Sequence, residues 1–318
     1  MKIFRTLSAL VTLVVFSSHS YADNWSDAIS RINGIRKASG LGRLSYDPRL
    51  RKAAYAHARY LASNGVHSHT QKRGKREYSG ATPSERIARA GYGCRVVVEN
   101  ISFGDKSYSH SVDTLMATLY HRLGFLDMRI DEIGAGRAGR KSSVFVYDMS
   151  SSVVKSLCRG SGRVTSGEYI YGICADSSKK ISKREFDRAV SKLYRKSAKV
   201  VLYPYDGEVG VARHFVNELV DPLGGRRGAG YPVTVQLNPA YYHPKGKPVF
   251  ELFDSKGKRV SCRKFDFSND PHHLLRPGSY AIIPNRVLKR GERYKVRFSI
   301  RTDRGRVSRN WSFVTGKR

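Results

Sequence analysis

The sequence predicts an α+β fold in two parts, a layered domain of helices and strands followed by an all-β domain. Three observations support this expectation. Apolar residues recur at helical spacing from Trp25 to Tyr120, before any long alternating pattern. Strand patterns follow at residues 133–149, and short strands separated by turns continue from Val200 onward. Helices first and strands afterwards are typical of α+β proteins.

The first 22 residues have the three parts of a secretory signal peptide. Lys2 and Arg5 precede an apolar run from Leu7 to Phe16, and a small-residue site ends at Ala22. The apolar run is about half of the roughly 20 residues that a transmembrane helix needs. We therefore expect an exported protein, secreted or periplasmic, without a transmembrane span.

Four helices are predicted in the first domain, which we place at residues 23–152. The first begins at Trp25 and ends before Gly40. Asp47 and Pro48 form an N-cap and a first-turn proline, so a second helix runs from Pro48 to Asn64. Its apolar face includes His57, which we interpret as a packed core residue.

The third and fourth helices follow from a capping box and an apolar stripe. Thr82 and Glu85 have the capping-box spacing, and Gly91 ends that short helix. The stripe that starts at Val112 predicts a fourth helix that runs up to His121. Strands are expected at 133–136 and 143–149; in the second, Val144 and Val146 face one way, and Phe145 and Tyr147 the other.

An ordered set of motifs relates this part to a known family. The motifs are Gly40–Leu50 (GLGRLSYDPRL), Val66–Thr70 (VHSHT), Val98–Ile101 (VENI), His121–Arg122 and Ile133–Gly136 (IGAG). Along residues 25–150 this order is similar to bacterial members of the CAP superfamily, the secreted cysteine-rich and pathogenesis-related proteins. The resemblance implies an α-β-α sandwich, which agrees with the predicted order of elements.

The resemblance also implies that His69, Glu99 and His121 line one cleft. Some family members bind a divalent metal there through the histidines, so zinc or another divalent metal is the implied cofactor, with His69 and His121 as ligands. His67 is a further candidate ligand, because in an extended segment it shares a side with His69. If the cleft is catalytic, His69, Glu99 and His121 are the implied catalytic residues, and Glu99 could act as a base on metal-bound water.

One departure from the family weakens a catalytic interpretation. The family cleft has two histidines and two glutamates, and the second glutamate lies on the helix before the last histidine. Here Ser111–Tyr120 contains only Asp113, about two turns too early. We therefore expect a non-catalytic or weakly metal-binding cleft. A purely structural hydrogen-bonded cluster and a metal-dependent hydrolase of peptide or cell-wall substrates remain the alternatives.

The four cysteines of an exported chain could form two disulfides in one of three connectivities. We expect Cys158–Cys174, the closest pair, and as a weaker inference Cys94–Cys262. The alternative is that some of them remain buried thiols.

A connector and a β domain make up the rest of the chain. The connector is placed at residues 153–198, with a helix at 182–198 that is basic on its outer side. Residues 199–318 are expected to form a β-sandwich. The predicted strands are Val233–Leu237, Val249–Phe253, Arg259–Cys262, Tyr280–Ile283, Tyr294–Ile300 and Trp311–Val314. Glu218–Val233 and Tyr294–Thr315 resemble Ig-like modules that are appended to bacterial CAP domains.

The charge is strongly one-sided, with a formal net charge of +32. Residues 153–318 carry 35 Lys and Arg against 14 Asp and Glu, so the second half holds most of the excess. Alternation in strand 294–301 places one basic set on an open face, and the next strand is expected to add two more cations. The predicted polyanion-binding set is Lys295, Arg297, Arg301, Arg306 and Arg309.

A basic face on a folded, exported protein indicates an anionic polymer as its partner. Lipopolysaccharide, acidic polysaccharide and extracellular DNA are the candidates; no nucleic-acid motif is present, so DNA is only one of them. We therefore expect an exported binding protein rather than an enzyme, with the metal-dependent hydrolase as the alternative.

Overall fold

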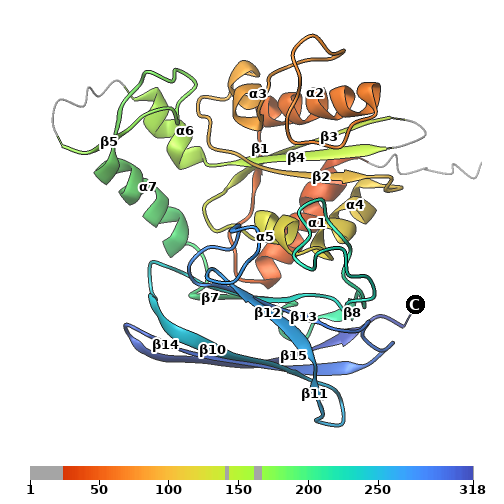
Figure 1. Cartoon of the computed structure of the whole chain (residues 1–318). Coiled ribbons are helices and arrows are strands. Elements are labelled where there is room, and N and C mark those ends of the chain that lie inside the picture. Colours follow the sequence, from red (N-terminus) through yellow and green to blue (C-terminus); the bar gives the residue numbers. More distant parts are fainter. Residues whose placement is uncertain (1–23, 140–142, 161–166, 318) are drawn as a thin grey trace, which may run out of the picture.

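The computed structural model describes residues 24–139, 143–160 and 167–317, and it arranges them as successive layers of helices and sheets (Figure 1). The predicted signal peptide, residues 1–22, lies outside the described residues. Within the described ranges, none of the helices combines the length and the apolar character that a membrane span requires.

The helices of the first domain are α1 (Trp25–Ala38), α2 (Pro48–Asn64), α3 (Pro83–Arg89), α4 (Tyr108–Met116) and α5 (Tyr120–Phe125). The predicted caps are present: the Asp47 side chain accepts a hydrogen bond from the Arg49 amide, and Thr82 from the Glu85 amide. The single helix predicted to run up to His121 was wrong. The chain leaves the helix at Ala117, and His121 lies instead in the first turn of a separate helix, α5.

A four-stranded sheet forms the centre of this domain, in the order β1-β3-β4-β2. Its strands are β1 (Ser45–Tyr46), β2 (Val98–Phe103), β3 (Glu132–Ala138) and β4 (Val144–Ser150). Val144 and Val146 pack in one apolar cluster with residues of α2, whereas Phe145 and Tyr147 pack in another with residues of α1 and α4. The predicted two faces of β4 and the α-β-α sandwich are thus confirmed (Figure 1).

The two glycines of the IGAG motif let α2 lie directly on β3. A Cβ atom on Gly134 would come within 2.0 Å of the Arg51 amide nitrogen, and one on Gly136 within 2.3 Å of the Tyr55 amide nitrogen. Atoms cannot approach so closely, so any side chain here would push the helix off the sheet.

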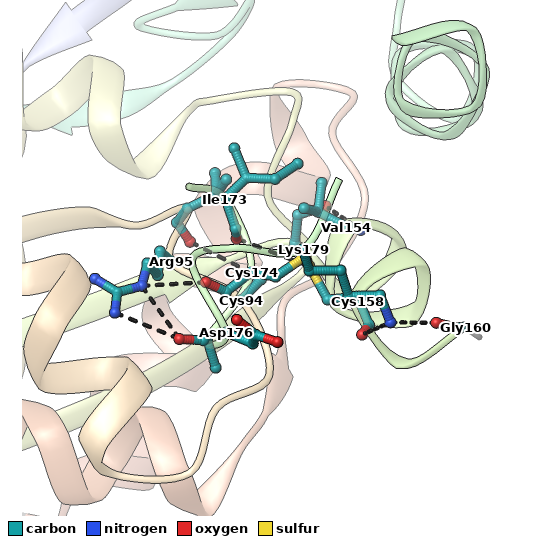
Figure 2. The surroundings of a disulfide bond; sticks show 12 residues. Cys94, Arg95, Val154, Cys158, Gly160, Ile173, Cys174, Asp176 and Lys179 are labelled. Atoms are coloured by element: carbon teal, nitrogen blue, oxygen red, sulfur yellow. Dashed lines mark hydrogen bonds between the residues drawn. A yellow bond between two sulfur atoms is a disulfide. The ribbon is translucent and has the colours of Figure 1, made fainter. Parts of the chain in front are cut away.

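The connector contains α6 (Ser152–Arg159), β5 (Tyr169–Ile170), β6 (Ile181–Ser182) and α7 (Lys183–Arg195). The predicted Cys158–Cys174 disulfide is confirmed, with Cα atoms 5.3 Å apart (Figure 2). The predicted Cys94–Cys262 disulfide is wrong, and both of these thiols are free. Cys94 pairs in a β-bridge with Cys174, beside the disulfide, whereas Cys262 begins a strand of the second domain.

The second domain consists of two sheets packed face to face. One has the order β11-β10-β14-β15-β8 and the other β12-β13-β9-β7. The rings of Phe298 and Tyr280 meet between them with centroids 5.4 Å apart. The strands are β7 (Val200–Tyr203), β8 (Val209–Val211), β9 (Val233–Leu237), β10 (Pro244–Phe253), β11 (Arg259–Val260), β12 (Cys262–Asp266), β13 (Ser279–Pro284), β14 (Arg293–Thr302) and β15 (Gly305–Thr315).

The two domains share one helical layer. Helices α1, α4 and α5 lie between the central sheet of the first domain and the β7-containing sheet of the second (Figure 1), and a single apolar cluster joins both sides. Arg122 of α5 is fully buried at this contact: its guanidinium donates to the Pro232 carbonyl and lies 4.9 Å and 4.3 Å from the ring centroids of Tyr203 and Tyr231. The layer that carries His121 is therefore packed on both sides.

Candidate functional site

A cavity of about 390 Å³ lies where the two domains meet, and the predicted histidines line it. Its walls come from the VHSHT segment, β2, the end of α4, α5 and a loop of the second domain. The lining residues are His67, Ser68, His69, Ile101, Ser102, Phe103, Thr114, Leu115, Thr118, His121, Val216, Asn217, Glu218 and Leu219.

His69 is oriented by a buried carboxylate. Its Nδ1 lies 2.8 Å from Oε1 of Glu99 on β2, and the other oxygen of Glu99 accepts a hydrogen bond of 2.6 Å from Arg86 on α3. Burial alone would raise the pKa of Glu99, but the hydrogen bond from His69 and the positive charge of Arg86 bring it below its ordinary value. Glu99 is therefore a charged acceptor buried behind His69, and it is not itself among the residues that line the cavity.

His121 is oriented by a second buried carboxylate, which sequence reasoning missed. Its Nδ1 lies 2.7 Å from Oε2 of Glu218, whose side chain is only 1% exposed. Glu218 belongs to the second domain, 97 residues further along the chain. Glu218 begins the segment that resembles Ig-like modules, but nothing in that pattern points to the cleft, because its role depends on how the two domains pack.

The expectation that the cleft lacks a second carboxylate is therefore corrected. The helix before His121 supplies none, since Asp113 turns away to pair with Arg31 of α1. Glu218 takes that role from outside the first domain. The departure from the family pattern lies in where the glutamate comes from.

The two imidazoles face one another. The ring centroids of His69 and His121 are 6.4 Å apart, and the ring planes differ by 24°. Among the described residues neither Nε2 has a hydrogen-bond partner, whereas both Nδ1 atoms are bonded to carboxylates. Both rings are thus held from one side and free on the other.

The other two histidines of this region differ in role. The ring of His67 stacks on Phe103, with centroids 3.8 Å apart, so it lines the cavity beside the pair. His57 is fully buried, as predicted, and its Nε2 lies 3.8 Å from Oε1 of Glu99. Burial lowers the pKa of His57 to about 4, so it is neutral at pH 7.

A buried aspartate lies beside Glu99 in the central sheet. Asp148 of β4 pairs directly with Glu99 of β2, so their side chains share one face. Burial and the nearby charge of Glu99 raise the pKa of Asp148 well above its ordinary value. Burial thus disfavours the ionised form of Asp148, whereas the contacts of Glu99 with His69 and Arg86 favour its ionised form.

The spacing of the paired imidazoles is close to the longest that a single metal ion could bridge. A Zn–N bond of about 2.1 Å places a metal roughly 3.2 Å from the centroid of each ring that binds it, so two such rings lie about 6.5 Å apart at a linear N–Zn–N angle and about 5.2 Å apart at a tetrahedral one. The observed 6.4 Å is near the linear limit, so a tetrahedral zinc ion would require the rings to move about 1 Å closer together. Histidines held by carboxylates at Nδ1 are the usual arrangement of metal-binding imidazoles. In the described part of the chain, no group of three or more His, Cys, Asp or Glu side chains is arranged as a metal site.

A second candidate site is the outer face of the β10-β14-β15 sheet. Lys295, Arg297 and Arg301 of β14 and Arg306 of β15 are all exposed. Arg301 pairs directly with Arg306 on one side and with Lys245 of β10 on the other, so three cations lie in one row across the sheet.

Arg309 was wrongly predicted to join this face. It pairs with Phe298, whose side chain is buried between the two sheets. Arg306 and Arg309 are three residues apart in one strand, and alternation sends side chains at odd spacing to opposite faces. The exposed cations on this surface of the sheet are therefore Lys245, Lys295, Arg297, Arg301 and Arg306. We call this set the basic face.

Comparison with known proteins relates the first domain to a known family. Residues 29–149 match the model of the CAP family, described as the cysteine-rich secretory protein family. No curated protein matches the chain. Among solved structures, an outer surface protein from Borrelia burgdorferi is 23% identical with a TM-score of 0.36, over 40% of this chain and 90% of that one.

Two further solved structures are similar. An extracellular protein containing an SCP domain from Bacillus anthracis is 20% identical with a TM-score of 0.35, over 39% of each chain. A cysteine-rich secretory protein from Staphylococcus aureus is 16% identical with a TM-score of 0.30, over 39% of this chain and 37% of that chain. Residues 29–149 of this chain are a CAP domain.

Proposed function

We propose that this chain is an exported protein that holds a divalent metal ion, such as zinc, between His69 and His121. One observation carries the proposal: each imidazole has its Nδ1 on its own buried carboxylate and turns its free Nε2 side to the same cavity. Neutral imidazole nitrogens suit zinc, copper and nickel. Export agrees with the predicted signal peptide and with the surface and extracellular proteins among the similar structures.

The same geometry favours binding over hydrolysis. A hydrolase needs a carboxylate that can reach metal-bound water. Here the oxygens of Glu99 are bonded to His69 and Arg86, and those of Glu218 to His121 and to backbone amides. Each of these four carboxylate oxygens therefore already accepts at least one hydrogen bond within the described part of the chain, which lowers its basicity toward metal-bound water. Bound metal would supply an electrophilic centre, with any remaining positions filled by water or by a ligand.

Calorimetric titration of the full chain with Zn²⁺ tests this proposal. We expect binding in the micromolar range or tighter, and a loss of at least about tenfold in His69→Ala and in His121→Ala. His243→Ala is the control, because that exposed histidine lies in the second domain, away from the lining residues. Unchanged affinity in both cleft variants would overturn the proposal.

The basic face supports a second function, the binding of anionic polymers such as lipopolysaccharide, acidic polysaccharide or extracellular DNA. The row Lys245, Arg301 and Arg306 carries this proposal. Like charges directly opposite one another in a sheet cost stability, so a row of three has to be explained by something other than folding. A polyanion laid across the strands would neutralise all three cations at once.

Binding to heparin, used as a probe polyanion, at increasing NaCl tests this second function. The combined substitution Arg297→Glu, Arg301→Glu and Arg306→Glu is expected to abolish retention at about 0.15 M salt. A matched control reverses three exposed arginines of α7 instead: Arg184→Glu, Arg188→Glu and Arg195→Glu. An equal loss in both triple variants would show that only net charge matters, and would contradict a site on the basic face.

A further inference from the structure

We propose that Glu218 is a positioning residue through which the second domain sets the orientation and tautomer of His121, so that the cleft is a two-domain site. This inference deepens the metal-binding function proposed above, and the benefit of orienting His121 rests on that function. The juxtaposition itself is a property of the protein alone, so it can be tested without metal.

Glu218 makes a concentrated set of contacts with the start of α5. Its Oε1 accepts hydrogen bonds from the amides of Leu119 and Tyr120, at 2.8 and 3.0 Å, while its Oε2 lies 2.7 Å from Nδ1 of His121. Helix α5 has no side-chain cap from its own N-cap residue, Leu119. The carboxylate therefore fixes the backbone that carries His121 and the ring itself.

The contact with Glu218 also fixes the proton on the ring. An ionised carboxylate only accepts hydrogen bonds, so the neutral ring of His121 must carry its proton on Nδ1. The lone pair then lies on Nε2, toward the cavity. Glu99 imposes the same tautomer on His69 from within the first domain. Two carboxylates from different domains thus prepare a matched pair of imidazoles.

Other contacts hold the segment around His121 to the second domain. The amide of Val216 donates a hydrogen bond of 3.0 Å to the Ala117 carbonyl, and the hydroxyl of Tyr120 donates one to the Asp270 carboxylate. Arg122, the residue after His121, donates a hydrogen bond to the Pro232 carbonyl. The segment from Ala117 to Arg122 is therefore fixed at several points by the second domain, and any shift of that domain would move His121.

Coupling between cleft and interface follows from this arrangement. A ligand that binds both imidazoles depends on the domain contact that positions one of them. By linkage, the same ligand must then stabilise the contact between the domains. The second domain is in this sense part of the cleft.

The test is ¹⁵N NMR of the histidine side chains in the full chain without metal, which distinguishes an Nδ1–H from an Nε2–H imidazole. In the wild type we expect His69 and His121 both as Nδ1–H. In Glu218→Ala, the Nδ1–H fraction of His121 should fall to less than about half, because Nδ1 loses its acceptor, while His69 stays unchanged. In Glu218→Gln, whose side-chain carbonyl can still accept, it should be largely restored.

Each outcome decides between the alternatives. An unchanged His121 in Glu218→Ala would overturn the proposal, and so would a change in both histidines, which indicates a general structural role. If Glu218→Ala does not fold, an Nε2–H tautomer of His121 in the wild type would overturn it equally. Correct tautomers without Zn²⁺ binding would instead refute the metal function and leave the positioning role of Glu218 intact.

Discussion

The cleft and the basic face both concentrate residues that can carry positive charge, but they do so in opposite ways. In the cleft, His69 and His121 are each held by a buried carboxylate from a different part of the chain. On the basic face, Arg301 lies directly between Arg306 and Lys245, and all three are exposed to solvent.

This difference teaches what each region can recognise. A pair of oriented imidazoles fixes positions to within tenths of an ångström and suits a small ligand such as a metal ion. Long exposed cations fix little and suit a flexible polyanion. The cleft should therefore respond to pH and to single buried substitutions, whereas the basic face should respond to salt.

The largest effect is expected from breaking the packing of α2 on the central sheet of the domain that carries His69 and His121. Gly136→Ala would place a Cβ atom 2.3 Å from the Tyr55 amide nitrogen, forcing α2 away from β3. We expect a loss of about 4 kcal/mol or more in the free energy of unfolding, measured with urea. Gly42→Ala is the control, because its Cβ would meet no atom within 4 Å. Comparable stability of the two variants would show that this close approach is unimportant.

The same substitution in both regions sharpens the comparison next. Glu99→Gln removes the charge that faces buried Arg86, and breaking such a buried pair costs about 3 kcal/mol. Glu251 lies directly opposite Arg297 of the basic face, and Glu251→Gln breaks its ion pair of 3.4 Å with the exposed Arg259, which is worth less than about 1 kcal/mol. Urea unfolding of both variants measures the two costs. Equal losses would mean that burial does not separate the two regions.

The pH response of the cleft region comes third. Burial lowers the pKa of His57 to about 4, so the unfolded chain takes up a proton there first as pH falls below about 6.5. Between pH 7 and 5 this should cost about 2 kcal/mol of stability, and the cost should approach its full size near pH 4. Urea unfolding at pH 7 and at pH 5 should therefore show that the wild type loses about 2 kcal/mol more of its free energy of unfolding than His57→Gln does. Parallel pH profiles for the two proteins would contradict it.

The smallest effect concerns repulsion on the basic face. Arg306→Thr removes the cation opposite Arg301, and should stabilise the protein by about 0.5 kcal/mol at low salt and by nothing measurable in 1 M NaCl. Arg309→Thr on the same strand is the matched control, since Arg309 lies opposite Phe298. A gain in both variants, or a gain that persists in salt, would locate the effect elsewhere than in the row of cations.

Features encoded by neighbouring residues were predictable from the sequence. The bounds of α2 follow from its cap at Asp47 and its left-handed Gly65, and β9 follows from a short apolar run between turns. The candidate cleft residues His69, Glu99 and His121 all came with the family motifs, and the contact between His69 and Glu99 is present. Such signals are local, so one sequence carries them.

Features set by long-range packing were not predictable. The apolar stripe continues across the break between α4 and α5, because its residues remain buried after the helix ends, so periodicity could not show where His121 leaves the helix. Glu218 begins the segment that resembles Ig-like modules, but no pattern links that segment to the cleft, and only the docking of the second domain brings Glu218 to His121. Arg309 is a simpler case, since counting its alternation from Arg306 would have placed it correctly.

The most direct test of the central claim is a crystal structure of the full chain grown with Zn²⁺, with diffraction data collected on both sides of the zinc absorption edge. We predict an anomalous peak between the Nε2 atoms of His69 and His121, about 2.1 Å from each, with Glu218 still bonded to Nδ1 of His121. Zinc bound only elsewhere on the chain, with the space between these two imidazoles empty, would contradict the account.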